Sequence, residues 1–283
     1  MSFRNKRTAD KSLEDAADPI HVFVATPAYD GRVYTDYAMS LAESARDATL
    51  FGIRITASVM GNGAFIDLAR NAFVRLFLET QCTHLFFIDA DLRWESRAFV
   101  GLLQSGLPIC AGIYPKRQDP EEYPCRMIEQ TPGAGIWVNS SGYIMCDRVA
   151  SGFLCISRAV AQRMYDEATH IKLAHGNERR VFYTDLNEHN EFIGEDYAFC
   201  TDYLRKYNEP IPVYPDFNFT HASRWKGNWH NFLNRQLDES KALIAKAHEE
   251  GKECVAELDS SGKLRGVSWI DIAKANDMTR EAA

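Results

Sequence analysis

Residues 83–94 read THLFFIDADLRW, an apolar run of strand length that ends in two acids one residue apart. An ionised carboxylate in a buried strand must be paired or bound to a cation, so we expect Asp89 and Asp91 at the strand's carboxyl end, at the mouth of a sheet. Residues i and i+2 of an extended segment point the same way. Both carboxylates can then face one Mg²⁺ or Mn²⁺ ion that keeps coordination sites for substrate phosphates. The alternative is that one acid caps the helix predicted to begin near Trp94.

The composition indicates a globular protein and argues against several functional classes. The chain has 283 residues, 46% of them hydrophobic, which suits one large α/β domain or one domain with an appendage. Its formal net charge of −7 argues against a surface built mainly to bind nucleic acid. No apolar run reaches the ~18 residues that span a membrane. Seven scattered cysteines favour reduced thiols in a cytoplasmic protein, and the polar residues 1–19 are expected to form a flexible leader.

Strand and helix patterns alternate along the first part of the chain. Apolar or β-branched runs predict strands at 21–25, 49–57, 85–88 and 108–113. Amphipathic stretches predict helices at 34–46, 65–79 and 95–104. This alternation is typical of βαβ units, so we expect an α/β fold with a mostly parallel, Rossmann-like central sheet flanked by helices.

The second part of the chain has a less regular pattern. Its predicted elements are a hairpin at 135–138 and 142–147, strands at 151–157, 181–184 and 212–214, helices ending at 164 and spanning 195–206 and 228–248, and a last hairpin at 255–258 and 264–267.

Three loops are expected at one edge of the predicted sheet, because ligands of such sheets bind outside the carboxyl ends of the strands. Residues 26–31 supply a hydroxyl and an aromatic ring, residues 89–94 the acids, and residues 114–117 a Lys-Arg pair. An aromatic ring can stack on a base, carboxylates can hold a metal ion, and cations can face phosphate. Together they suggest a nucleotide site, although polar surface loops alone prove little.

Two later features could belong to the same site. Glu195 and Asp196 open a predicted helix, where acids also offset the helix dipole, so a structural role is the alternative. His221 follows the predicted strand at 212–214, in a loop from which an imidazole could reach the cation at the paired acids.

The order of these motifs resembles that of nucleotide-sugar glycosyltransferases of the GT-A fold, most of all the small transferases of viruses, phages and bacteria. The resemblance covers residues 21–230. It is carried by four short elements in this order: the Thr26-Pro27 loop, ARN at 69–71, FIDAD at 87–91 and GED at 194–196. It implies a GT-A catalytic domain over 20–249 with a small antiparallel sheet on the acceptor side and a C-terminal helix, followed by an extension over 250–283.

The resemblance also implies residues that bind the donor and the metal. Asp89, Ala90 and Asp91 would form the D-x-D motif that holds Mn²⁺ or Mg²⁺ against the donor diphosphate, and His221 would be the third protein ligand of the ion. The remaining donor contacts would come from Thr26, Pro27, Tyr29, Arg70 and Lys116.

On the acceptor side the resemblance implies an acid near the acceptor hydroxyl. In an inverting reaction Asp196, with Glu195 as the runner-up, would act as general base, which is worth roughly 10²–10⁴-fold in rate. In a retaining reaction the same acids would orient the acceptor. Acceptor contacts are expected from Gly152, where a glycine suggests close approach, and from Trp225 and Trp229, which could stack on sugar rings or on flipped bases.

The prediction is therefore a metal-dependent hexosyltransferase that uses a nucleotide-diphosphate sugar, with a UDP-sugar favoured, and has no membrane partner. Its acceptor would be a saccharide or a hydroxymethylated DNA base. A nucleotidyltransferase also carries paired acids at a strand end but tends to have a glycine-rich phosphate loop, whereas residues 28–31 contain one glycine. A non-catalytic module that binds nucleotide sugars is the third possibility.

Overall fold

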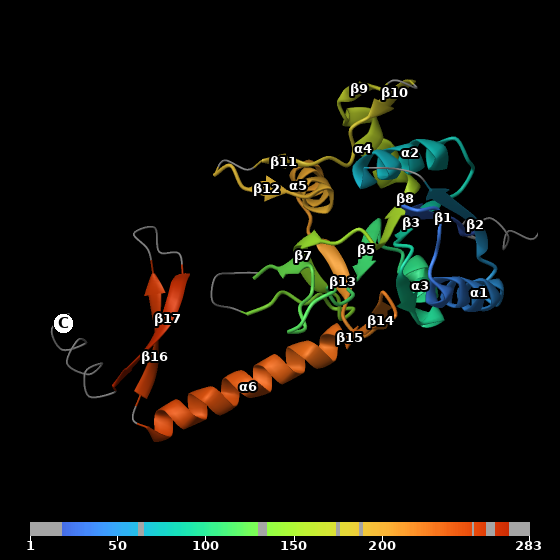
Figure 1. Ribbon diagram of the computed structural model, residues 1–283. Helices are drawn as coiled ribbons and strands as arrows, with labels where there is room; N and C mark the ends of the chain where they lie inside the picture. The colour runs from blue at the N-terminus through green and yellow to red at the C-terminus, as the bar shows by residue number, and fades with distance from the viewer. Residues whose placement is uncertain are drawn as a thin grey trace, which may run out of the picture. The chain divides into compact units, whose positions relative to one another are not determined.

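The computed structural model describes residues 19–61, 65–129, 135–173, 176–186, 189–250, 252–258 and 264–271 (Figure 1). The chain forms two compact units, Met1–Asn228 and Trp229–Ala283. The boundary lies at the start of the helix that the sequence placed at the end of the catalytic domain, and the predicted limits of 20–249 and 250–283 stay a prediction. The predicted leader falls almost wholly outside the described residues.

An eight-stranded sheet forms the centre of the first unit, in the order β2-β1-β3-β8-β5-β13-β7-β6. Strand β1 pairs in parallel with β2 and β3, and β13 pairs in parallel with β5, whereas β8 and β7 run antiparallel to their neighbours. The predicted α/β class with a mostly parallel sheet is confirmed. The strands are β1 (His21–Ala28), β2 (Arg54–Gly61), β3 (His84–Ile88), β5 (Ile109–Gly112), β6 (Cys125–Met127), β7 (Ile144–Val149), β8 (Phe153–Ser157) and β13 (Ile211–Tyr214).

Helices cover both faces of the sheet near β1 and β3, with α1 and α3 on one side and α2 and α4 on the other (Figure 1). Consecutive side chains of β3 therefore meet different helices. Phe86 stacks on Phe99 of α3 at 5.0 Å between ring centroids, and Phe87 meets Phe73 of α2 at 6.4 Å. A strand buried on both faces has a continuous apolar run, which explains the sequence LFFI. The helices are α1 (Thr35–Thr49), α2 (Ile66–Leu78), α3 (Ser96–Gln104), α4 (Arg158–Glu167) and α5 (Glu195–Tyr207).

Small antiparallel sheets surround the central one. The most important for the site joins β4 (Leu92–Trp94), β14 (Asn218–His221) and β15 (Trp225–Asn228) in the order β15-β14-β4. The others pair β9 (His170–Leu173) with β10 (Gly176–Arg179) and β11 (Asp185–Leu186) with β12 (Phe192–Ile193). The sequence placed His221 in a loop, whereas the structure makes it the last residue of β14, because β14 pairs with the three-residue strand β4 that no local pattern indicated.

The limits of several elements differ from the prediction. Strand β1 continues through Ala28, into the segment predicted as a loop, and β2 begins at Arg54, because helix α1 extends to Thr49. The predicted strand at 181–184 is wrong. The buried Asn71 side chain bonds the backbone N–H groups of Val181 and Phe182 and donates to the Phe182 carbonyl, so these groups need no strand partner. The predicted hairpin strand at 135–138 forms isolated bridges.

The second unit consists of α6 (Trp229–Glu249) and a hairpin of β16 (Lys252–Leu258) and β17 (Leu264–Asp271). Both the helix and the hairpin were predicted. Within the described part of the chain, no helix has the length and apolar character that crossing a membrane requires.

Six cysteines of the first unit are free, namely Cys82, Cys110, Cys125, Cys146, Cys155 and Cys200, and the reduced state of the thiols stays a prediction.

Candidate functional site

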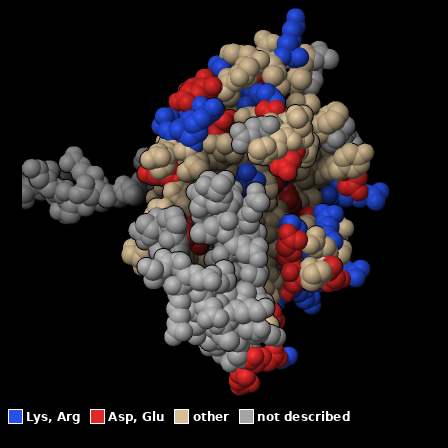
Figure 2. All heavy atoms as spheres, turned by 90° about the vertical axis from the view of Figure 1, so that its left-hand side faces the viewer, with Lys and Arg blue, Asp and Glu red and all other residues tan. Residues whose placement is uncertain are grey.

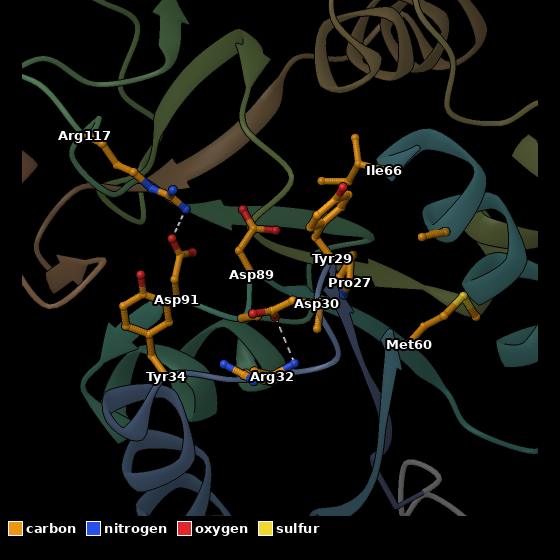
Figure 3. A pocket seen from close by; sticks show the side chains of 13 residues that line it. Pro27, Tyr29, Asp30, Arg32, Tyr34, Met60, Ile66, Asp89, Asp91 and Arg117 are labelled. Carbon is orange, nitrogen blue, oxygen red and sulfur yellow. Dashed lines mark hydrogen bonds and ion pairs between the residues drawn. The ribbon is translucent and has the colours of Figure 1, made fainter. Parts of the chain in front are cut away.

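A pocket of about 410 Å³ lies at the carboxyl ends of β1 and β3 (Figure 3). Its wall includes the end of β1 and the segment that follows it, residues 89–91 after β3 and Arg117 after β5. The residues from the first of these regions are Pro27, Ala28, Tyr29, Asp30, Arg32 and Tyr34. The three loops predicted at one sheet edge therefore do meet, because β1, β3 and β5 run in the same direction.

The paired acids point toward this pocket, as Figure 3 shows for Asp89 and Asp91. The buried strand β3 ends at Ile88, and the Asp89 N–H donates to the Gly152 carbonyl at 3.0 Å. A turn follows, in which the Leu92 N–H donates to the Asp89 carbonyl at 3.2 Å. The Asp91 side chain is only 8% exposed, so its charge needs a partner.

His221 lies beside Asp91 because the register of the small sheet places it there. His221 is paired with Leu92 across β14 and β4, and the Ala222 N–H donates to the Asp91 carbonyl at 2.8 Å. The His221 Nε2 atom is 3.4 Å from the Asp91 carboxylate. The predicted convergence of an imidazole with the acid pair is thus found for Asp91.

Two hydrogen-bond partners, the Pro115 carbonyl and Arg117, determine which nitrogen of the His221 ring carries the proton. The Pro115 carbonyl lies 2.8 Å from Nδ1 and can only accept, so Nδ1 carries a proton. Burial and the positive charge of Arg117 lower the pKa of His221, against the effect of the Pro115 bond. The neutral ring then accepts from the Arg117 Nε–H at its Nε2 lone pair, 3.0 Å away, and this is the tautomer that a metal ligand at Nε2 requires.

Arg117 occupies the position between these two groups. Its guanidinium forms an ion pair with Asp91, drawn as a dashed line in Figure 3, and its Nε lies 3.0 Å from His221 Nε2. Sequence reasoning selected the neighbour, Lys116, as the donor contact. Lys116 instead forms an ion pair with Glu122 and does not line this pocket, because the two adjacent side chains point to different sides of the segment.

Asp89 is held from the opposite side by Arg70, whose side chain is only 2% exposed. The Arg70 guanidinium lies 3.3 Å from Asp89 and 5.3 Å from the centre of the Phe87 ring. Burial acts to lower its pKa, but the surrounding carboxylates outweigh burial and raise it. Arg70 does not line the pocket, because α2 turns Ala69 toward it and Arg70 into the interior, and the expected contact with the donor stays a prediction.

Arg70 also connects the pocket to the acids of α5. Its guanidinium lies 3.6 Å from Glu195 and 3.8 Å from Asp196. Burial, followed by the negative charge of Asp196, raises the pKa of Glu195 to about 7 even though Arg70 opposes the shift. The Asp196 Oδ1 and Arg70 Nε atoms are buried with no hydrogen-bond partner among the described residues. The second acid pair therefore lies next to the first, with one buried cation between them.

The other residues predicted to contact the donor lie in or near the first pocket. Pro27, Tyr29 and Ala90 line the pocket, and their roles stay predictions. Thr26 does not line it, because the residue is fully buried and its hydroxyl is hydrogen-bonded to Tyr37.

The close approach predicted at Gly152 is made by the protein itself. A Cβ atom there would lie 2.1 Å from the Tyr114 hydroxyl and 2.2 Å from Asp89 Oδ2. Tyr114, which donates to that Asp89 oxygen at 3.1 Å, was not found by sequence reasoning. Trp225 is on β15, and Trp229 begins α6 in the second unit. The acceptor roles of Gly152, Trp225 and Trp229 stay predictions.

The groups around Asp91 include donor atoms that could bind a divalent cation. Asp91 and His221 offer a carboxylate and an imidazole lone pair around one cationic group. The carboxylate is of the ligand type that suits Mn²⁺ or Mg²⁺, whereas an imidazole is not a typical ligand of the hard Mg²⁺ ion. Asp89 is occupied by Arg70 and Tyr114. No group of three or more His, Cys, Asp or Glu residues within the described ranges is arranged to hold a metal ion, so the three-ligand site stays a prediction.

Comparison with known proteins gives matches among solved structures only. No family model and no curated protein matches the sequence. A197 from STIV is 14% identical with a TM-score of 0.44, over 71% of this chain and 85% of that chain. GalNAc-T7, solved with UDP, GalNAc and Mn²⁺, is 8% identical with a TM-score of 0.41, over 73% of this chain and 44% of that chain. These likenesses concern the fold alone. This chain spans less than half the length of GalNAc-T7.

Proposed function

We propose that this protein is a glycosyltransferase that binds the diphosphate of a nucleotide sugar in the pocket at the ends of β1 and β3. The observation that carries the proposal is the meeting of Asp91 and His221 on one cationic group, the guanidinium of Arg117. These groups come from three separate segments, and two of them, Asp91 and Arg117, line a cavity large enough for a small ligand.

The outer part of the pocket suits the base of the donor. Pro27, Met60 and Ile66 give it an apolar wall, and the Tyr29 side chain is 79% exposed at its rim. An exposed aromatic ring on an apolar wall can stack on a planar base. The base would then lie at the β1 and β2 side of the pocket, with the diphosphate toward Asp91 and Arg117. A uridine diphosphate sugar is the proposed donor.

Asp91 and His221, with Asp89 as the further carboxylate, would hold Mn²⁺ or Mg²⁺. Such an ion supplies Lewis-acid stabilisation of the departing nucleoside diphosphate. When the ion is bound, Arg117 would move away from Asp91. Its planar guanidinium is suited to bidentate contact with phosphate oxygens.

The acid pair at the start of α5 supplies a base for the acceptor. In an inverting reaction the acceptor oxygen forms a bond to the anomeric carbon, the bond to the diphosphate oxygen breaks, and the hydroxyl proton passes to a carboxylate. A pKa near the working pH suits a general base. The pKa of about 7 favours Glu195 for this role over Asp196, the residue that the resemblance suggested first. The acceptor itself is a saccharide or a modified nucleobase under this proposal.

The proposal can be tested by thermal unfolding with UDP- and GDP-sugars, each with and without Mn²⁺. We expect one nucleotide sugar to raise the Tm only when the ion is present, because a ligand that binds the folded state stabilises it. Asp91→Asn should lose this shift, whereas Asp166→Asn, on the exposed side of α4, should keep it. The proposal fails if no sugar nucleotide stabilises the protein with metal. Pyrophosphate release from a nucleoside triphosphate and a sugar phosphate would instead indicate a nucleotidyltransferase.

A further inference from the structure

A second cavity, of about 340 Å³, lies between residues 115–121 and the strand β15. Its wall includes Lys116, Arg224, Trp225 and Lys226, together with the acids Asp119 and Glu121. None of these residues lines the first pocket. The cavity is therefore a separate candidate site within the first unit.

The two cavities share one segment of chain. Arg117 lines the first pocket, and its neighbours Pro115, Lys116 and Gln118 line the second. A ligand in the second cavity would therefore lie across a single segment from the proposed diphosphate site.

His221 joins the same two regions. It touches Asp91 on the side of the first pocket, and its backbone pairs with Trp225 in the β14–β15 hairpin. This proximity is what an acceptor subsite requires.

The wall of the second cavity is closely packed. A Cβ atom on Gly227 would lie 2.2 Å from the Tyr123 hydroxyl and 2.9 Å from Glu121 Oε1. The Tyr123 hydroxyl in turn donates to that Glu121 oxygen at 2.6 Å. Strand β15 therefore lies directly against residues 121–123, and the cavity is enclosed by packed backbone and side chains on this side.

Two cations in the cavity remain available to a ligand, against one weakly paired acid, Asp119. Lys226 makes no ion pair with any residue in the described ranges. Arg224 reaches Asp119 only at 3.7 Å, between side chains that are 71% and 80% exposed, a pair that contributes little. Glu121 is already bonded by Tyr123. An anionic group entering the cavity would thus meet two cations whose present partners are weak or absent.

Trp225 adds an aromatic surface to these cations. Its indole is half-buried, its Nε1 atom has no hydrogen-bond partner among the described residues, and the Arg224 guanidinium lies 4.9 Å from the ring centre. A few polar groups around an aromatic wall are typical of a small-molecule pocket. The indole can pack on a sugar ring and donate one hydrogen bond after a small adjustment.

We propose that the second cavity is the acceptor subsite and that it binds a saccharide carrying a carboxylate or phosphate group. This inference rests on the proposed function and adds the substrate class. A nucleic acid strand is less suited, because backbone-tracking proteins present a continuous positive groove. On the face drawn in Figure 2, basic and acidic side chains are interspersed over the described residues, and the chain as a whole carries a formal charge of −7.

Calorimetric titration of the full chain with three probes tests the assignment. The probes are methyl glucuronide, glucose 6-phosphate and methyl glucoside, the last being the neutral match. We expect at least one anionic probe to bind about tenfold or more tightly than the neutral sugar, equivalent to ~1.4 kcal/mol. Which anionic probe binds better distinguishes a carboxylate acceptor from a phosphorylated one.

Matched variants locate the binding. Lys226→Met should remove the preference for the anionic probe, whereas Lys172→Met, at an exposed lysine of β9, should keep it. Trp225→Phe should weaken binding of all probes, and Trp137→Phe, in a different pocket, should not. Equal binding of charged and neutral sugars, no binding of any, or no effect of Lys226→Met would overturn the inference. So would tighter binding of a single-stranded oligonucleotide that Lys226→Met abolishes.

The thermal shift caused by a nucleotide sugar and Mn²⁺ separates this inference from the proposed function. Trp225→Phe and Lys226→Met should leave that shift unchanged. If the donor shift is present and anionic sugars fail to bind, only the acceptor assignment is wrong. If the donor shift is absent from the unmodified protein, the proposed function itself fails.

Discussion

Arg70 and Arg117 contact the same D-x-D segment from opposite sides, and the fold holds them very differently. Arg70 is 2% exposed on helix α2 and lies near three carboxylates. Arg117 is 52% exposed on the segment after β5 and contacts one carboxylate and one imidazole. The buried cation is part of the core. The exposed one can be exchanged for another cation, since solvent reaches its guanidinium although Asp91 itself is buried.

Removal of the buried cation is expected to have the largest effect. Arg70→Met leaves Asp89, Glu195 and Asp196 together without compensation, and removing one partner from a buried ionic group costs about 3–5 kcal/mol. Denaturant unfolding measures the loss. Arg163→Met is the control, because that arginine pairs with Glu167 at the surface and should cost less than about 1 kcal/mol. Equal losses in the two variants would show that Arg70 is not the central cation of the site.

Removal of the acid shared by Arg117 and His221 should mainly affect activity. Asp91→Ala is expected to lower the transfer rate by roughly 100-fold or more, because the proposed ion loses a ligand that stabilises the leaving group. The Asp91 side chain pairs with the exposed guanidinium of Arg117, which can turn to solvent when the carboxylate is removed. The variant should therefore still fold. Steady-state rates and the circular dichroism spectrum separate the two effects. A variant that folds and keeps more than a tenth of the wild-type rate would argue against metal binding at Asp91.

The acids beside Arg70 should make stability depend on pH. The pKa of Glu195 is raised from its ordinary value of 4.5 to about 7, so the folded protein binds a proton more tightly than the unfolded chain does. The resulting stabilisation is present below pH 4.5 and is lost as the pH rises through about 7. Glu195→Gln should flatten the fall in unfolding free energy between these values, measured by denaturant titration. A fall of the same size in both proteins would assign the titration to another group.

The smallest expected effect on stability belongs to the exposed cation. Arg117→Met should lower the free energy of unfolding less than Arg70→Met does, because Arg117 is half exposed and leaves one carboxylate without a cation, whereas Arg70 leaves three. The same change should raise the KM for the nucleotide sugar about tenfold, because a charge-assisted contact to the diphosphate is lost. Lys116→Met, at the neighbour that points away from the pocket, should leave that KM unchanged. A reversed pattern between the two variants would restore Lys116 as the donor contact.

Local sequence patterns were sufficient for much of the fold and for part of this site. The apolar run before Asp89 predicted β3, and the alternation of strands and helices predicted the mostly parallel sheet. The partnership of Asp91 with His221 was also predicted. Its cause was not, because it depends on β4, whose three residues pair with a strand more than a hundred positions away.

The errors concern properties that only the tertiary structure determines. Two adjacent cations, Lys116 and Arg117, have the same local signal, and the course of the chain decides which of them reaches Asp91. The resemblance placed Arg70 at the donor, whereas the structure buries it. Its burial depends on three carboxylates contributed by β3 and α5, which no pattern within α2 could reveal.

The hydrogen bond from His221 Nδ1 to the Pro115 carbonyl connects the two cavities physically. Any ligand that displaces the backbone at Pro115 must also reorient the imidazole, and with it the electron pair offered on the far side of the ring. Linkage then works in both directions: if occupancy of one cavity alters affinity at the other by some factor, the reverse influence has the same size. The His221 ring and the Pro115 carbonyl oxygen would therefore couple the binding of the two substrates.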